Sequence, residues 1–241
     1  MSITWDGISS EEFNMTLLSD IKFESVERDV EIIEIPGRDG AVVVDNKRNK
    51  NVPLTLEFQM KLTSEFMNIE NQIKAVLSWL SNLYSFKSFS WVGESDYIFL
   101  AKVNAKATFD RTNQIYARLS IPISLHPYKF IRTTFDIPSP LTSGKSFTSQ
   151  GTQKSSPIIT LTGTGNITLT VNGDKFILKN ITGGVVIDSE NQVVTDLTKK
   201  HSQMDKVYSY PFPRLKMGSN TISWDNTDFT GTIIERWCEL V

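Results

Sequence analysis

Apolar and polar residues alternate along much of the first half of the chain. Apolar side chains occupy every second position from Val52 to Met60, and a similar alternation runs over residues 97–109. It resumes over residues 115–125 after the polar stretch 110–114. Because successive side chains of a strand point to opposite faces of a sheet, this pattern predicts half-buried strands. The last two runs, with the polar stretch between them, predict a long antiparallel hairpin.

Two shorter apolar runs, residues 30–35 and 41–44, flank the segment 36–40, whose sequence is Pro-Gly-Arg-Asp-Gly. Proline, glycine and the Asp-Gly pair are typical of tight chain reversals, so we expect a second hairpin here. Residues 46–51 come next and are polar and basic. Their composition predicts a solvated loop between strands.

One segment has the three- and four-residue spacing of an amphipathic helix. Its apolar positions are Phe66, Ile69, Ile73, Val76, Leu77, Leu80 and Tyr84. We therefore predict one helix from about Ser64 to Tyr84 that packs on a sheet. Thr63 or Ser64 is a suitable N-cap residue, because its hydroxyl can accept a hydrogen bond from a free backbone N–H group.

The composition and the spacing of apolar residues change in the second half of the chain. Residues 136–157 are rich in Ser, Thr, Pro, Gly and Lys, which is typical of a domain boundary. Beyond it the apolar runs are shorter, and Asn172-Gly173 stands between two alternating runs, the strongest short-range hairpin signal. Closely spaced short strands indicate a β-sandwich or jelly roll. We expect domains at residues 1–135 and 158–241, joined by a linker or arm at 136–157.

Composition changes this picture little. The 241 residues are 39% hydrophobic and 22% charged, and the formal net charge of −2 gives no overall reason to bind nucleic acid or an anionic membrane surface. Residues 1–6 lack the basic and apolar regions of a signal peptide, so we expect a protein that is made and kept in solution. Cys238 is the single cysteine, which excludes an intrachain disulfide, and we interpret it as a small apolar strand residue.

No catalytic constellation is visible in the sequence. The two histidines, His126 and His201, are not part of a metal-binding motif, and no nucleotide-binding or nucleophile motif occurs. Asp188, Glu190 and Asp205 do not have the spacing of a calcium-binding loop. We therefore expect no enzyme, no metal and no cofactor. A hydrolase with an acid pair assembled by the fold is the catalytic alternative.

Four features follow one another along essentially the whole chain. They are the turn at 36–40, the helix followed by a hairpin that closes at 127–130, the run from Gly163 to Glu190, and the ending from Phe212 to Ile222. Their order and spacing resemble the distal tail protein (Dit) family, the baseplate hub of siphophages that infect Gram-positive bacteria. No single motif among them is specific to this family, so the resemblance rests on the order and spacing of the four features.

The resemblance implies a mostly β fold: an N-terminal β-barrel-like domain with one α-helix, then a C-terminal galectin-like β-sandwich. It also implies a structural protein of the virion tail tip, assembled in the host cytoplasm. Such proteins form a homohexameric ring with a central channel through which DNA passes. The ring joins the tail tube protein to the tail-associated lysin or fibre protein, and its C-terminal domains face baseplate or receptor-binding proteins. The resemblance implies no binding to a membrane.

For such a hub, several charged residues are candidates for subunit contacts. Arg38 and Asp39 occupy the predicted hairpin tip and either bridge subunits or form a solvated turn with a weak local salt bridge. Lys47, Arg48 and Lys50 either contact a neighbour, line the channel or belong to a plain solvated loop.

Aromatic residues suggest a second function class. Tyr208, Tyr210 and Phe212 lie in a proline-bounded segment, a candidate contact surface, and Trp224 follows. These rings motivate the alternative of a carbohydrate-binding or adhesin module in host cell-wall recognition. The His-x-Asn-x-Arg and Trp-x-x-Glu-x-Arg strands of a galectin sugar site are absent from the sequence.

Overall fold

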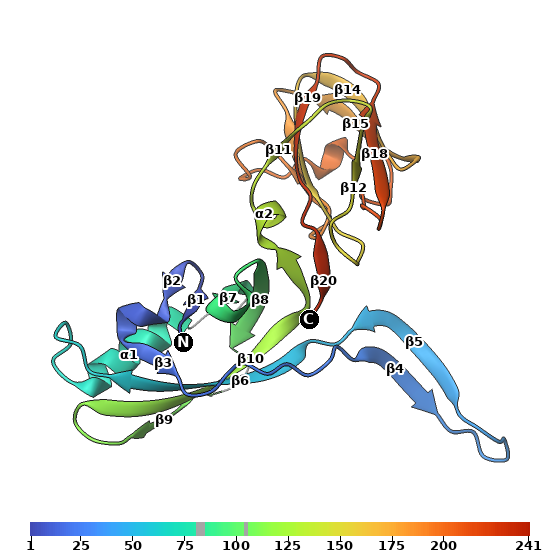
Figure 1. Ribbon diagram of the computed structural model, residues 1–241. Coiled ribbons are helices and arrows are strands. Elements are labelled where there is room, and N and C mark those ends of the chain that lie inside the picture. Colours follow the sequence, from blue (N-terminus) through green and yellow to red (C-terminus); the bar gives the residue numbers. More distant parts are fainter. Residues whose placement is uncertain (81–84, 104–105) are drawn as a thin grey trace. The chain divides into compact units, whose positions relative to one another are not determined.

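The structure is a computed structural model that describes residues 1–80, 85–103 and 106–241. Most of its regular elements are strands (Figure 1). The chain divides into two compact units. The first comprises Met1–Lys129 and Leu240–Val241, and the second comprises Phe130–Glu239. Among the described residues, no helix is long and apolar enough to cross a membrane.

The first unit is built on a sheet of nine strands among the described residues, in the order β2-β1-β7-β8-β10-β6-β3, with β9 and β20 also paired to β10. The strands are β1 (Ile3–Trp5), β2 (Ile8–Ser9), β3 (Met15–Leu17), β6 (Val52–Lys61), β7 (Lys87–Trp91), β8 (Tyr97–Val103), β9 (Thr108–Arg111), β10 (Tyr116–Ile131) and β20 (Cys238–Leu240). Two 3-10 turns, η1 (Ser10–Phe13) and η2 (Val92–Glu94), belong to the same unit.

Strands β6 and β10 form the long antiparallel pair at the centre of this sheet. Their register runs from Tyr116 opposite Lys61 to Leu125 opposite Val52. Every second side chain of β6 from Val52 to Met60 is buried, which confirms the strand predicted from the alternation. The first arm of the predicted hairpin over 97–125 is present as two strands, β8 and β9, which both pair with β10, and residues 104–105 lie outside the described part.

The helix α1 (Ile69–Leu80) packs against this sheet through Ile69, Val76 and Leu80, which are buried. Its predicted start at Ser64 is wrong by five residues, because Asn68 supplies the cap instead: its Oδ1 accepts the N–H of Asn71 at 2.9 Å. Residues 81–84 of the predicted helix lie outside the described residues.

The hairpin predicted around residues 36–40 is confirmed as β4 (Arg28–Ile33) and β5 (Val42–Asn49). It forms a two-stranded sheet of its own and projects from the rest of the first unit (Figure 1). The loop predicted at 46–51 is wrong in part, since residues 46–49 belong to β5. Cross-strand pairing with Arg28 extends the strand through this polar stretch.

The second unit contains two sheets, ordered β11-β19-β13-β16-β17 and β12-β18-β14-β15. The strands are β11 (Ser139–Leu141), β12 (Lys145–Thr148), β13 (Ile158–Thr162), β14 (Gly165–Val171), β15 (Asp174–Ile181), β16 (Val185–Asp188), β17 (Val193–Thr195), β18 (Ser219–Trp224) and β19 (Thr230–Ile234), accompanied by the short α2 (Arg132–Phe135) and η3 (Met204–Lys206). The two sheets share one apolar core, so the unit is a β-sandwich. Residues 136–157, assigned above to a linker or arm, contain β11 and β12.

Local sequence explains two further details of the fold. Asn172 and Gly173 have φ values of 53° and 97°, as the tight turn between β14 and β15 requires. Cys238 is 3% exposed, and burial raises the pKa of its thiol to about 12. A thiol with such a pKa is protonated at neutral pH and unreactive, in line with its interpretation as a packing residue.

Candidate interaction surfaces

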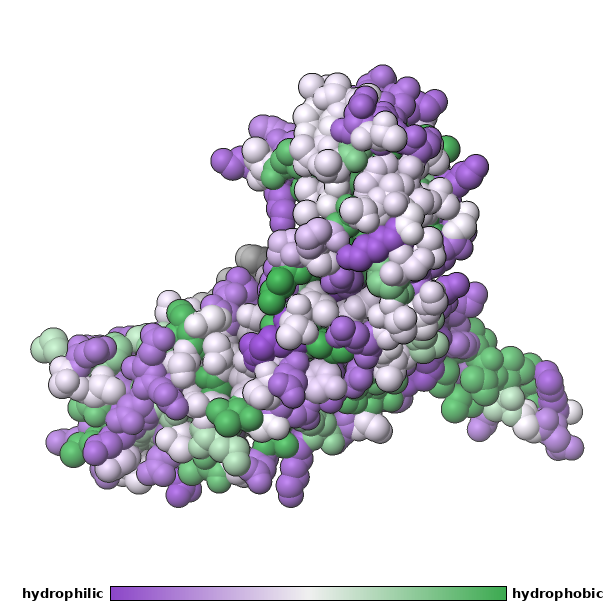
Figure 2. Space-filling model, turned by 45° about the horizontal axis from the view of Figure 1, so that its top comes forward, coloured by the Kyte–Doolittle hydropathy of each residue, from purple (hydrophilic) through white to green (hydrophobic). Residues whose placement is uncertain are grey.

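Apolar side chains are exposed on both faces of the β4–β5 hairpin. Ile32 lies opposite Val43 and Ile33 opposite Val42, and because cross-strand partners point to the same side, each pair lies on a different face. Ile32 and Val43 are 65% and 62% exposed. Ile33 adds exposed apolar area on the second face, and Figure 2 shows hydrophobic surface over the hairpin with hydrophilic residues at its end. Exposed apolar side chains of this kind make the hairpin a candidate interaction surface.

At the base of the hairpin, Arg28 and Asp45 form a bidentate ion pair across the two strands. The Arg28 Nε and Nη2 atoms donate to the two carboxylate oxygens of Asp45, each at 3.0 Å. The Lys47 N–H also donates to Asp45 Oδ1 at 2.7 Å. The hydrogen bond from Arg28, followed by that from Lys47, lowers the pKa of Asp45 below its usual value. The carboxylate therefore holds both strands as long as it is ionised.

Two further ion pairs extend this base. Arg48 Nε lies 2.5 Å from Asp29 Oδ2, and Lys50 Nζ lies 2.8 Å from Glu27 Oε1. The hydrogen bond from Arg48 lowers the pKa of Asp29, and the bond to Glu27 raises the pKa of Lys50. Of the predicted contact residues, Arg48 and Lys50 therefore form ion pairs within the hairpin base, and Lys47 contributes its backbone N–H. Their role at a subunit interface stays a prediction.

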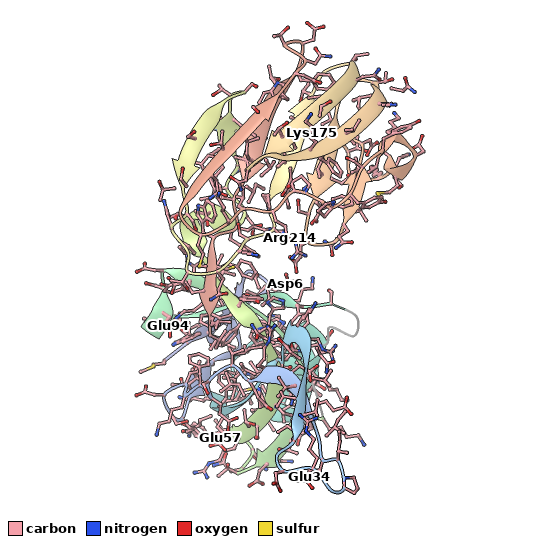
Figure 3. All side chains as sticks on the ribbon, turned by 90° about the vertical axis from the view of Figure 1, so that its right-hand side faces the viewer. Asp6, Glu34, Glu57, Glu94, Lys175 and Arg214 are labelled. Carbon is pink, nitrogen blue, oxygen red and sulfur yellow. The ribbon has the colours of Figure 1, made fainter. Side chains whose placement is uncertain are left out.

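The predicted contact residues Arg38 and Asp39 lie at the opposite end of the hairpin. Both are exposed, and Glu34 precedes this tip (Figure 3). The Arg38 N–H donates to the Ile35 carbonyl at 3.2 Å, which closes the turn. No salt bridge involving Arg38 or Asp39 occurs within the described residues. Their charges are thus directed to solvent in the single chain.

In the second unit, Tyr208 and Tyr210 are 56% and 67% exposed. The Tyr208 ring lies under Lys179, whose Nζ is 4.4 Å from the ring centroid. The Phe212 side chain, in contrast, is only 4% exposed, and its role at a contact surface stays a prediction. Its ring packs on Phe176 with the centroids 5.0 Å apart, so Phe212 is a core residue. The prolines that flank Phe212 are visible in the sequence, but the burial of its side chain could not be predicted from them.

The residues considered for catalysis or metal binding lie in ordinary structural roles. The Asp188 carboxylate accepts the N–H groups of Glu190 and Asn191, which makes it a turn residue. His126 packs with Phe86 and Tyr128, and His201 is exposed. Within residues 1–80, 85–103 and 106–241, no group of three or more His, Cys, Asp or Glu side chains is placed to hold a metal ion.

The exposed apolar faces of the hairpin were not recognised as a candidate surface from the sequence, although a signal was present. Residues 30–35 and 41–44 contain adjacent apolar residues, Ile32-Ile33 and Val42-Val43-Val44. Adjacent apolar residues in a strand point to opposite faces, so no polar face is left. That pattern differs from the strict alternation of β6.

No family model matches the sequence, and no curated protein matches it either. The structure is similar to a solved one, the "Crystal Structure of SPP1 Dit (gp 19.1) Protein, a Paradigm of Hub Adsorption Apparatus in Gram-positive Infecting Phages". The two share a TM-score of 0.67 and 13% sequence identity, and the match covers 96% of each chain. At this identity the match shows the fold, and it confirms the mostly β fold expected from the sequence.

Proposed function

We propose that this chain is a structural hub protein of a phage tail tip. In this proposal six copies form a ring around a channel for DNA, and the ring joins the tail tube protein to the tail-associated lysin or fibre protein. The second unit, taken to be the galectin-like domain of the resemblance, attaches baseplate or receptor-binding proteins. The fold shared with SPP1 Dit, described as a hub adsorption protein, supports this role.

The observation that carries the proposal is the β4–β5 hairpin. An isolated two-stranded hairpin is at best marginally stable in water, and this one exposes apolar side chains on both faces. Ile32 and Val43 gain most from burial, because fully covering an aliphatic side chain contributes about 1.5–3 kcal/mol. We assign the covering surface to a second copy of the chain.

The first unit also offers an edge for such a copy. Strand β3 pairs with β6 only at Phe58–Met60, so residues 53–56 have no strand partner on that side among the described residues. A groove of about 530 Å³ runs between residues 17–24 and residues 53–57. A hairpin that docks at a different site on the next copy makes a head-to-tail contact, and such contacts form a ring when the rotation between copies closes.

Charge introduced on the hairpin tests this proposal. The double variant Ile32→Glu, Val43→Glu places two carboxylates on one apolar face, so we expect the particle mass to fall from that of a hexamer toward the 27.2 kDa of one chain. Light scattering of the purified protein, alone and mixed with its tail partners, measures this mass.

The matched control is Leu197→Glu, Met217→Glu, which places the same charges on exposed apolar residues of the second unit. We expect the control to keep the mass of the unaltered protein. A ring that survives both substitutions in the hairpin, or a protein that stays monomeric with its partners present, contradicts the proposal.

The second candidate function is carbohydrate binding by the second unit. The exposed rings of Tyr208 and Tyr210 favour it, because sugars stack on exposed aromatic faces. Calorimetry with host wall polysaccharide tests it. Heat that disappears in Tyr208→Ala, Tyr210→Ala supports this function, and the absence of heat in the unaltered protein removes it.

A further inference from the structure

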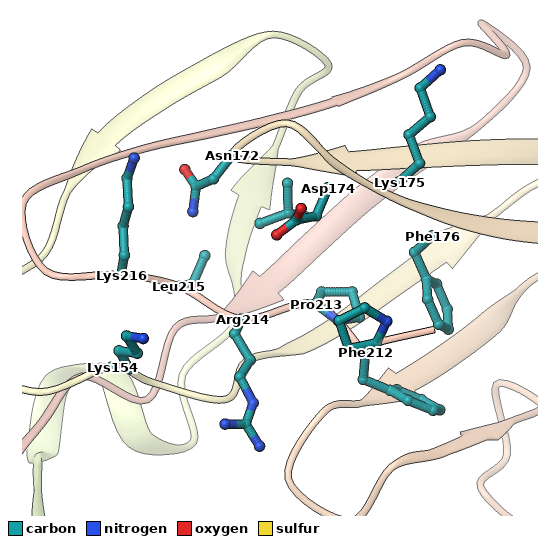
Figure 4. Close-up of a pocket in the computed structure, with 12 residues that line it drawn as sticks. Lys154, Asn172, Asp174, Lys175, Phe176, Phe212, Pro213, Arg214, Leu215 and Lys216 are labelled. Carbon is teal, nitrogen blue, oxygen red and sulfur yellow. The ribbon is translucent and has the colours of Figure 1, made fainter. Parts of the chain in front are cut away.

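A cleft of about 330 Å³ opens in the second unit between the β14–β15 turn and the segment 211–216 (Figure 4). Its floor consists of apolar side chains that are almost fully buried: Val171, Phe176, Phe212 and Leu215. The rim is polar and includes Lys154, which comes from a separate stretch of chain. The cleft therefore combines an apolar floor with a hydrophilic rim.

The backbone around the cleft is held in place by several hydrogen bonds. Ser155 and Leu215 exchange N–H and carbonyl groups at 3.0 Å in both directions, which fixes the segment next to Lys154. The Lys216 N–H donates to Asn220 Oδ1 at 2.8 Å, and Asn220 returns a bond of 2.8 Å to the Lys216 carbonyl. Because Asn220 is fully buried, these bonds fix the position of the rim before any ligand arrives.

Positive charge dominates this rim. Four cationic residues line the cleft, namely Lys154, Lys175, Arg214 and Lys216, against the single acid Asp174. Figure 4 shows Lys154, Arg214 and Lys216 on one side, while the Lys175 side chain points away. Within the described residues none of the four has a salt bridge. The whole chain carries a net charge of −2, so this excess of positive charge is local to the cleft. It favours an anionic ligand.

We infer that this cleft binds an acidic peptide segment that also carries an apolar side chain. The Arg214 guanidinium is exposed, and its planar donors match a carboxylate. The lysines add point charges, and the floor at Phe176 and Phe212 accepts an aliphatic or aromatic side chain. A phosphate polymer uses the cations and leaves the apolar floor without a partner. The inference rests on the proposed function only in assigning the peptide to another virion protein.

Fluorescence anisotropy of the full-length chain with a labelled peptide of alternating glutamate and leucine tests the inference at low salt. The double variant Arg214→Glu, Lys216→Glu reverses two rim charges, and we expect affinity for the peptide to fall about tenfold or more. The matched control, Lys199→Glu, Lys200→Glu, reverses two exposed charges of the same unit outside the cleft, and we expect it to bind as the unaltered protein does. Equal binding by both variants overturns the inference.

Two further measurements fix the nature of the ligand. Replacing leucine by serine in the peptide is expected to weaken binding about fivefold, because the floor loses its partner. Inorganic polyphosphate is expected to compete poorly. If it competes as well as the peptide, or if the serine peptide binds equally, the cleft recognises a polyanion and the peptide inference is wrong. The single variant Lys154→Glu repeats the charge test should the double variant fail to fold.

The cleft and the ring are tested separately. We expect Arg214→Glu, Lys216→Glu to keep the particle mass of the unaltered protein, and the hairpin variant Ile32→Glu, Val43→Glu to keep its affinity for the peptide. Absence of peptide binding by an intact ring overturns the cleft alone. Peptide binding by a protein that never assembles contradicts the ring alone.

Discussion

The hairpin β4–β5 and the sandwich of the second unit are both antiparallel β-structure, yet they treat apolar side chains in opposite ways. In the sandwich, Leu169 of β14 and Ile187 of β16 belong to different sheets and are fully buried in one shared core. In the hairpin, Ile32 and Val43 face solvent. The sandwich completes its own core, whereas the hairpin has apolar faces that the single chain does not cover.

The largest expected effect is a difference in the free energy of unfolding between variants of the sandwich core and variants of the hairpin. Leu169→Ala removes a fully buried side chain, so we expect the free energy of unfolding of the second unit to fall by about 2–5 kcal/mol. Ile32→Ala removes an exposed side chain, and we expect less than about 0.5 kcal/mol in the single chain. Urea unfolding of the monomeric protein measures both. A large loss for Ile32→Ala means that the hairpin is covered within the chain.

Acid is expected to have a smaller effect, concentrated on the base of the hairpin. The bonds from Arg28 hold the pKa of Asp45 below its usual value of 3.8 in the folded state. Because the folded pKa is lowered, the stabilisation is fully present above that value and is lost as the pH falls through the folded pKa. We expect cross-strand NMR contacts of β4 and β5 to weaken in this acidic range.

A matched pair of variants localises the effect. Asp45→Asn should reduce the pH dependence of the hairpin, and the Asp29–Arg48 pair accounts for the part that remains. Asp225→Asn should leave it unchanged, because the Asp225 carboxylate, whose pKa is also lowered, accepts the Thr168 N–H in the second unit. A hairpin whose contacts persist in acid with Asp45 protonated shows that the ion pairs at its base are dispensable.

The smallest expected effect concerns the tip of the hairpin. Exchanging its charges with Arg38→Asp, Asp39→Arg is expected to weaken ring assembly by no more than about 1 kcal/mol, since exposed ion pairs contribute about 0–1 kcal/mol. Concentration-dependent light scattering detects this as a several-fold shift in the dissociation midpoint. An unchanged midpoint shows that Arg38 and Asp39 form a solvated turn.

The sequence predicted elements wherever a local pattern decided the structure. The alternation from Val52 to Met60 and the Asn172-Gly173 turn act through neighbouring residues, and both are found as expected. The helix start was wrong because three residues near it, Thr63, Ser64 and Asn68, are all suitable caps, and tertiary contacts select among them. One such contact is the bond from the Thr63 N–H to the Gln72 side chain at 2.9 Å.

The candidate surfaces were predicted less well, because they depend on burial and on residues far apart in sequence. Phe212 and Tyr210 stand two positions apart in one segment, yet one is buried and the other is exposed. The cleft brings Lys154 near Arg214 and Lys216, across about sixty residues of chain. No pattern within a short window contains that relation.

The burial of Cys238 has a practical consequence for studying the proposed ring. Its thiol is 3% exposed and burial raises its pKa to about 12, so we expect no reaction with maleimide reagents under native conditions near neutral pH. A cysteine introduced at Asp39, at the exposed tip of the hairpin, is therefore expected to be the thiol that accepts a dye, with no need to remove the natural one. Energy transfer between copies labelled at that position would report the distance between hairpins directly.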